Sequence, residues 1–308
     1  DLRMSRGLGD VYKRQKLNPG DKVGIISPSS FLRNREAVEL GLDYLRSLKL
    51  EPVLGEHVFD AFRYMAGTPE DRTADLHRFY AAPEIKAVFC TAGGSGSQYM
   101  LPLIDYELVR RNPKPLFGFS DNTALQLGLY ARAKAVTCTG FTLKYDFKNG
   151  HIDGFVDETL RTVISGGKLD LRGGQTVIGG QTEGILLGGC LSLFRNLCGT
   201  PFYPDLTDAV LLIEDVGEKT YKIDLMLQQL TLCPGFERIK GIVFGEFADA
   251  EIADPEDGSI DDVIAEFCRN IKIPVIKNFP YGHVPSRAVM PIGAPVRLNA
   301  DDCRLTWL

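Results

Sequence analysis

The segment 118–123 (GFSDNT) is the strongest chemical signal in the sequence. It follows an apolar run over 114–119 and precedes a helical pattern over 122–133, so Ser120 is expected on a tight strand-to-helix turn. A serine there exposes its hydroxyl where the helix N-terminus and the next backbone N–H can stabilise an oxyanion. Gly118 leaves room for the turn, although Asn122 stands where the usual elbow has a second glycine. The segment therefore fits a nucleophile, and also a serine and an aspartate that only cap the helix.

A second glycine-rich turn, Gly93-Gly94-Ser95-Gly96, follows the expected strand 87–91. Its backbone N–H groups can hold a phosphate or an oxyanion, but the turn is neither a Walker loop nor a GxGxxG motif. Neighbouring strand ends of a parallel sheet converge, so this turn can supply a second oxyanion donor to Ser120. The alternative is a tight turn with no chemical role.

A serine nucleophile needs a base, and the sequence has four histidines. His77 lies in a polar helical pattern and is expected to face water, while His57 and His151 lie in loop-like stretches. His283 stands in a loop bracketed by glycine and proline (281–285, YGHVP), where an imidazole is held rigidly. His283 is therefore the candidate base, with an ordinary surface histidine as the alternative.

A third group must orient the base, and the apolar strand 209–214 ends in two carboxylates. Glu214 follows the apolar run directly, whereas Asp215 should point to the other face by strand alternation. A carboxylate at a buried strand end can fix the tautomer of an imidazole and stabilise its charged form. A solvated strand end is the alternative reading of Glu214.

The sequence contains no HExxH motif, no EF-hand loop and no cluster of histidine and cysteine ligands. Neither a catalytic metal nor a cofactor is therefore expected. Serine, histidine and carboxylate chemistry is what these residue types support.

The bulk properties describe an ordinary globular protein. A chain of 308 residues with a formal charge of −5 favours two domains and disfavours a nucleic-acid or anionic-membrane partner. No apolar run approaches the ~20 residues that span a bilayer. Seven cysteines without a CxxC pair indicate reduced thiols. Residues 1–15 resemble no secretory signal and are expected to be a disordered leader, which points to the cytoplasm.

Strands and helices alternate over 22–133, which predicts an α/β fold with a doubly wound parallel sheet. The helices are expected over 35–48, after the N-cap Thr68, and over 122–133. We expect an N-terminal nucleophile domain at 16–148, a glycine-rich connection at 149–183 and a C-terminal domain at 184–308. The second domain is expected to open with a helix over 187–197, followed by further strands and helices.

The chain resembles the serine-type LD-carboxypeptidases (muramoyltetrapeptide carboxypeptidases), whose relatives include the microcin-immunity peptidases. The resemblance runs from about Lys16 to Leu308, and its matching stretches are LNPGDKV and SPSS, AGT with Arg72, GFSDNTA, GGCLS, EDV with YKID, and YGH. It implies an N-terminal flavodoxin-like domain and a smaller C-terminal α/β domain with a barrel-like sheet.

The resemblance also implies a Ser120–His283–Glu214 triad and an oxyanion hole formed by the Asp121 amide and the turn at Gly93-Gly94. The active site then lies between the domains, usually in a homodimer. The implied substrate is a murein peptide with a terminal D-alanine, cleaved through an acyl-enzyme.

Two positions depart from many family members, which carry arginine before the paired glycines and tyrosine after them. This chain has Ala92 and Ser95 there, so Ser95 is a candidate substrate contact. Arg287, four residues after His283, is a candidate for binding the free carboxylate of the substrate. The wording Thr91-Ala92-Gly93-Gly94 leans towards the immunity peptidases, so a peptidyl-nucleotide substrate remains an alternative, as does a non-catalytic protein that binds a small ligand.

Overall fold

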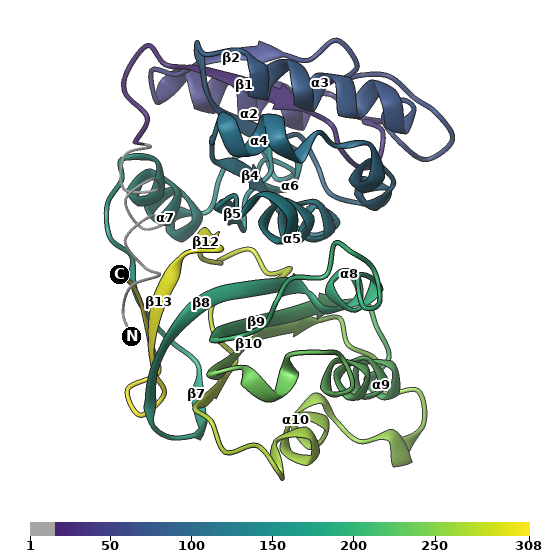
Figure 1. Cartoon of the computed structure of the whole chain (residues 1–308), viewed down its shortest axis with the longest axis vertical. Helices are drawn as coiled ribbons and strands as arrows, with labels where there is room; N and C mark the ends of the chain where they lie inside the picture. The colour runs from purple at the N-terminus through teal and green to yellow at the C-terminus, as the bar shows by residue number, and fades with distance from the viewer. Residues whose placement is uncertain (1–15) are drawn as a thin grey trace. The chain divides into compact units, whose positions relative to one another are not determined.

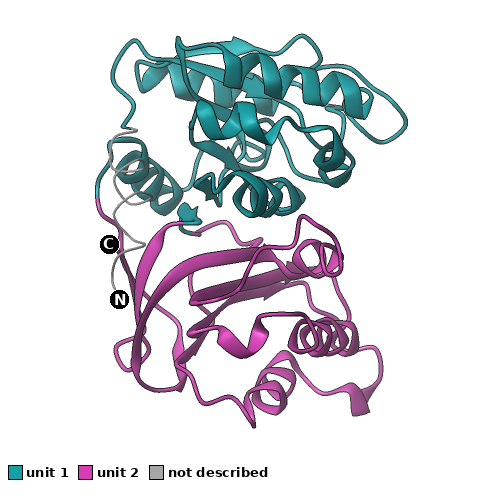
Figure 2. Cartoon of the chain, in the orientation of Figure 1, with its two compact units in different colours: residues 1–167, 288–293 teal, residues 168–287, 294–308 magenta. Residues whose placement is uncertain are grey.

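A computed structural model describes residues 16–308, which form two compact units (Figure 2). The first unit runs to Gly167 and also includes Ala288–Gly293. The second unit comprises Lys168–Arg287 and Ala294–Leu308. The expected leader 1–15 lies outside the described residues. Among the described residues, no helix combines the length and the apolar character that crossing a membrane requires.

The first unit is built on a six-stranded sheet with the order β12-β5-β4-β3-β1-β2 (Figure 1). Neighbouring strands are parallel except at β12, which pairs antiparallel with β5. The strands are β1 (Lys22–Ile26), β2 (Glu51–Leu54), β3 (Ile85–Cys90), β4 (Leu116–Gly118), β5 (Thr137–Thr139) and β12 (Met290–Ile292). The order of the five parallel strands is that of a flavodoxin-like sheet, which confirms the predicted fold of this half.

Helices cover this sheet in two groups, since α3, α4 and α5 pack side by side and α2 packs on α6. The helices are α2 (Glu36–Ser47), α3 (Pro69–Ala81), the 3-10 helix η2 (Ser97–Leu103), α4 (Tyr106–Arg111), α5 (Asn122–Ala133), α6 (Leu143–Asp146) and α7 (Gly154–Ile164). Helix α3 begins where the sequence predicts: Thr68 accepts a hydrogen bond from the Asp71 N–H, and the Asp71 carboxylate accepts one from the Thr68 N–H. That capping box fixes the start of the helix.

The second unit is built on an eight-stranded mixed sheet with the order β6-β14-β13-β8-β9-β10-β11-β7. Its strands are β6 (Asp170–Arg172), β7 (Gln175–Ile178), β8 (Gln181–Cys190), β9 (Ala209–Val216), β10 (Gly241–Ala248), β11 (Val275–Lys277), β13 (Pro295–Asn299) and β14 (Arg304–Trp307). The outermost strands β6 and β7 are joined only by Gly173 and Gly174, so the sheet must curl until its two edges approach. The predicted smaller α/β domain with a barrel-like sheet is thereby confirmed.

The helices of the second unit are α8 (Leu191–Asn196), α9 (Thr220–Thr231), the 3-10 helices η3 (Phe236–Arg238) and η4 (Pro255–Asp257), and α10 (Ile260–Cys268). The helix expected over 187–197 is wrong in its first turn, because residues 187–190 complete strand β8. Gly188 and Gly189 have φ of 129° and 135°, and a Cβ on Gly188 would lie 2.0 Å from the Leu212 carbonyl oxygen. Both glycines therefore belong to a strand rather than a helix, and Gly188 allows the close approach to β9.

Two sequence interpretations need correction. Cys198 and Cys233 form a disulfide between the segments that follow α8 and α9, so the reduced-thiol reading is wrong for this pair. The stretch 149–183 contains helix α7, strands β6 and β7 and the start of β8, so it is not a bare connection. Its glycines mark the turns between these short elements.

Candidate active site

Ser120 stands on the turn between β4 and α5 in the left-handed conformation, with φ of 64°. This conformation is strained for a residue other than glycine, so contacts with the surrounding residues must stabilise it. The Asn122 side chain supplies that hold, because its Oδ1 accepts from the Phe119 N–H at 3.1 Å and its Nδ2 donates to Ser29 Oγ at 2.8 Å. A Cβ on Gly118 would lie 2.8 Å from Asn122 Cβ, so the turn requires glycine at 118. The Asn122 side chain thus stabilises the strand-to-helix turn that carries Ser120, although the usual nucleophile motif has glycine at position 122.

The glycine turn lies directly against this serine. A Cβ on Gly93 would be 2.8 Å from Ser120 Cβ and 3.2 Å from Ser120 Oγ. Gly94 has φ of 108°, and a Cβ there would be 2.3 Å from Ser30 Oγ. Only glycine therefore allows the backbone of this turn to approach the hydroxyl.

The turn's later N–H groups are occupied by side chains. Ser30 Oγ accepts from Ser95 at 3.0 Å, and the carboxylate of Asp121 accepts from Gly96 at 3.3 Å and from Ser97 at 2.8 Å. Within residues 16–308, the N–H groups of Gly93, Gly94 and Asp121 have no hydrogen-bond acceptor. Unoccupied N–H groups next to a serine hydroxyl are what oxyanion binding requires.

The second unit contributes Glu214, near the end of β9, and His283. Glu214 is fully buried, the His283 side chain is 8% exposed, and His283 Nδ1 lies 2.7 Å from Glu214 Oε2. When the Glu214 carboxylate is ionised it can only accept, so in that state Nδ1 donates this hydrogen bond and Nε2 is the ring nitrogen that can accept a proton. The pair is therefore arranged as a base and the carboxylate that orients it.

Burial raises the pKa of the Glu214 carboxyl, and the hydrogen bond from His283 opposes this effect. The positive charge of Arg287 also favours the ionised form of Glu214. Glu214 Oε1 is buried and has no hydrogen-bond partner among the described residues. Its ionisation therefore depends on His283 and on the charge of Arg287.

Arg287 is only 1% exposed, and its Nη1 donates to the carbonyls of Val284 at 3.1 Å and Pro285 at 3.4 Å. These bonds brace the loop that presents His283. The carboxylate-binding role that the sequence suggests for Arg287 stays a prediction.

Gly282 fixes the backbone beside the histidine. It has φ of 132°, and a Cβ on it would lie 2.7 Å from the Glu246 carbonyl oxygen and 3.4 Å from Glu214 Oε2. Asp215, next to Glu214, turns the other way as strand alternation predicts, because its carboxylate accepts from the Ser192 N–H at 2.7 Å. Glu214, not Asp215, is therefore the carboxylate that faces His283.

The candidate residues thus fall into two groups. Ser120, Asp121 and the turn Gly93-Gly94 are together in the first unit, with the exposed Ser95 beside them. Glu214, His283 and Arg287 are together in the second. Sequence reasoning gave no role to Ser30, to the Asn122 side chain or to Arg72, although each lies in a stretch that carried the resemblance.

Two other features lie outside these groups. In the described part of the chain, possible ligand atoms of His57, Asp60 and Asp71 lie within 4.8 Å of one another. His57 Nδ1 is 2.7 Å from Asp60 Oδ2 and Asp71 caps α3, so both carboxylates have structural partners. His77 is half-buried and accepts from the Asp105 N–H, so the expectation that it faces water is wrong.

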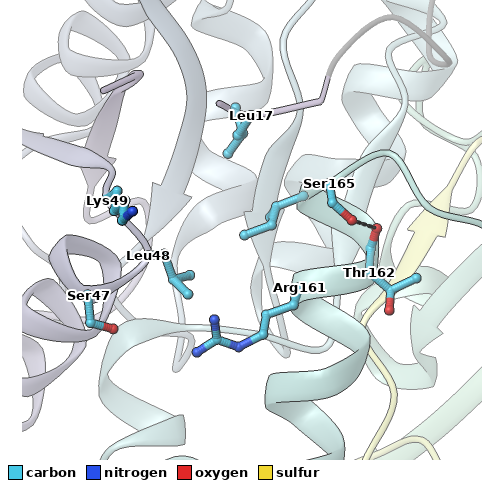
Figure 3. A pocket seen from close by; sticks show the side chains of 8 residues that line it. Leu17, Ser47, Leu48, Lys49, Arg161, Thr162 and Ser165 are labelled. Carbon is cyan, nitrogen blue, oxygen red and sulfur yellow. Dashed lines mark hydrogen bonds between the residues drawn. The ribbon is translucent and has the colours of Figure 1, made fainter. Parts of the chain in front are cut away.

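A shallow hollow of about 490 Å³ lies in the first unit (Figure 3). None of the candidate site residues lines it. Its lining residues are Leu17, Ser47, Leu48, Lys49, Arg161, Thr162, Ile164 and Ser165.

Both halves of the chain match known domain families. Residues 23–140 match the LD-carboxypeptidase N-terminal domain, and residues 183–298 match the LD-carboxypeptidase C-terminal domain. The chain is 35% identical to a Streptomyces coelicolor protein named as a carboxypeptidase, over 97% of each chain. It is 31% identical to a Bacillus subtilis protein named as a murein peptide carboxypeptidase, over 94% of this chain and 92% of that one.

A crystal structure of an MccF-like protein from Bacillus anthracis has a TM-score of 0.87 and 26% identity, covering 96% of this chain and 98% of that chain. MccF is the name of the microcin C7 self-immunity protein of Escherichia coli. The two domain matches together span more than half of the sequence, in the same order as in the family. The chain therefore belongs to the LD-carboxypeptidase family.

Proposed function

We propose that the protein is a serine LD-carboxypeptidase, which removes the terminal D-alanine from murein tetrapeptides with Ser120, His283 and Glu214. The observation that carries the proposal is the left-handed Ser120 held against Gly93, because an unstrained turn would suffice for a helix cap. The relative named as a murein peptide carboxypeptidase supports the substrate class.

In the proposed reaction, His283 Nε2 takes the proton of the Ser120 hydroxyl as Ser120 Oγ attacks the carbonyl of the scissile bond. The N–H groups of Asp121 and of the turn at Gly93-Gly94 bind the oxyanion. Glu214 stabilises the imidazolium that forms, which then protonates the leaving D-alanine. Water, activated by the same imidazole, hydrolyses the acyl-enzyme and frees Ser120.

The test is a mass-spectrometric assay on L-Ala-γ-D-Glu-meso-diaminopimelyl-D-Ala. Wild-type protein is expected to release one alanine, and Ser120→Ala protein to release none while keeping its fold by circular dichroism. Equal turnover by both proteins would remove Ser120 from the mechanism. No release by either protein would remove this substrate.

A second candidate is the same chemistry on a peptidyl-nucleotide antibiotic, favoured by the fold shared with the MccF-like protein and by the Thr91-Ala92-Gly93-Gly94 wording. Measuring hydrolysis of a peptidyl-nucleotide and of the tetrapeptide at equal concentrations distinguishes the two candidate functions. The proposal predicts a higher kcat/KM for the tetrapeptide, and the reverse order would favour the second candidate.

We further propose that the enzyme acts in the cytoplasm as a homodimer, on peptides released during cell-wall recycling. Light scattering at several protein concentrations tests the assembly, and a monomeric mass throughout would contradict it.

A further inference from the structure

We propose that Arg72 is a positioning residue for the reaction, which holds the glycine turn at 93–96 in the shape that receives the oxyanion. The proposal rests on the function proposed above. Arg72 belongs to helix α3 and is among the largest fully buried side chains, with 2% of its surface exposed. An arginine buried to this degree must have its charge and its N–H groups satisfied within the protein.

The guanidinium of Arg72 joins separate segments of the first unit. Nη1 donates to the carbonyl oxygens of Pro28 and of Gly96, the latter at 2.9 Å. Nε donates to the Thr68 carbonyl oxygen at 3.3 Å, and Nη2 lies 3.2 Å from Met65 Sδ. The segment after β1, the loop before α3 and the glycine turn therefore all contact one side chain.

The counter-charge is Asp121, which follows the proposed nucleophile. Its carboxylate is buried and accepts from the N–H groups of Gly96 and Ser97, while its own carbonyl accepts from Ser97 Oγ at 2.6 Å. Burial lowers the pKa of Arg72, and the negative charge of Asp121 is the largest influence in the opposite direction. Arg72 and Asp121 are therefore two buried groups of opposite charge that bind the same turn.

The two groups bind the two peptide units that flank the Gly96 Cα. Asp121 binds the N–H of Gly96 and Arg72 binds its carbonyl oxygen, at a residue with φ of 117°. Ser30 Oγ fixes the preceding N–H, that of Ser95. With these groups fastened, the N–H groups of Gly93 and Gly94 keep a fixed direction beside Ser120, as preorganised oxyanion binding requires.

Lysine cannot replace this arrangement. Its ammonium is a single point charge, whereas the planar fork of arginine reaches several acceptors at once. Arg72→Lys therefore keeps the positive charge next to Asp121 and loses the geometry at Gly96. A small misplacement of catalytic groups costs about 10²-fold in rate.

The experiment measures tetrapeptide hydrolysis and the rate of covalent labelling by a fluorophosphonate for wild type, Arg72→Lys and Arg78→Lys. Arg78 lies on the same helix but is exposed and paired with Glu56, so Arg78→Lys is the matched control. Arg72→Lys is expected to lower kcat and the labelling rate in parallel, by about 10- to 100-fold, with KM unchanged. Arg78→Lys is expected to match wild type in both.

A lower Tm of Arg72→Lys with kcat and labelling rate as in wild type, measured well below that Tm, would overturn the proposal. If Arg72→Lys does not fold, the readouts are taken on Asp121→Asn, which keeps the backbone N–H and loses the charge. A parallel decrease in kcat and in the labelling rate of Asp121→Asn supports the proposal. Values equal to those of wild type overturn it. Wild type that is labelled but does not cleave the tetrapeptide overturns the proposed function alone, because labelling needs the turn and not the peptide.

Discussion

At the residue scale, the candidate chemistry could be predicted because each group sits at the end of an apolar strand or in a rigid loop. Ser120, Glu214 and His283 are recognisable from their neighbours in sequence alone. Arg72 and Ser30 were given no role because their function comes from contacts with residues more than twenty positions away. No local sequence pattern indicates contacts between residues so far apart.

Replacing Glu214 by glutamine should leave the fold intact and lower kcat by about 10³–10⁴-fold. The amide carries no charge, so it neither stabilises the imidazolium nor enforces the proton on Nδ1 of His283. Steady-state kinetics on the tetrapeptide measures the effect. Glu246→Gln is the control, because Glu246 is a half-buried carboxylate on the neighbouring strand β10 and not the described residue that bonds to His283 Nδ1. Equal losses in both variants would contradict the role assigned to Glu214.

At the element scale, strands and helices with clear periodicity lie where the sequence predicts them, such as α2, α3 and α5. The sequence prediction is wrong where a glycine is needed for a tertiary contact. Gly188 and Gly189 look like small helical residues in the sequence, but both lie in strand β8, and Gly188 permits β8 to approach β9 closely. The disulfide between Cys198 and Cys233 likewise joins residues 35 positions apart, so no local pattern reveals it.

The buried Lys114, which precedes strand β4 and whose side chain binds the C-terminal end of helix α3, gives a prediction for the pH dependence of stability. Its Nζ donates to the carbonyls of Phe79, at 2.6 Å, and Ala82, and burial with the nearby charge of Lys86 lowers its pKa to about 8. Between pH 8 and its ordinary value of 10.5, the unfolded chain binds more protons at this site than the folded one. The free energy of unfolding therefore gains a contribution that rises with pH across this window.

Denaturant unfolding of wild type and Lys114→Met at a series of pH values tests this. The stability of wild type relative to the variant is expected to rise from pH 8 towards pH 10, and to be flat below pH 7. A constant difference across the whole range would contradict the lowered pKa.

At the scale of the whole molecule, the α/β class and the two domains could be predicted from the alternation of elements and from the resemblance. The return of the chain from the second unit to the first could not be predicted. Strand β12 comes late in the sequence yet completes the sheet of the first unit, where it pairs with β5. Its short apolar run carries no signal for which sheet it joins.

A fragment ending at Gly167 should therefore be unstable. It lacks Met290 and Ile292, which are buried and contribute about 1.5–3 kcal/mol each, and it exposes the edge of β5. Appending residues 288–293 through a flexible linker is expected to raise its Tm and reduce aggregation. Equal thermal melts of the two fragments would contradict the assignment of β12 to this unit.

The most direct test of Ser120 as the nucleophile is the site of covalent labelling by a fluorophosphonate, mapped by peptide mass spectrometry. We expect one adduct, on the peptide that contains Ser120. It should be lost in Ser120→Ala and retained in Ser47→Ala, because Ser47 is an exposed serine on α2. Labelling at another serine, or none in folded wild-type protein, would contradict Ser120 as the nucleophile and favour a protein that binds its ligand without cleaving it.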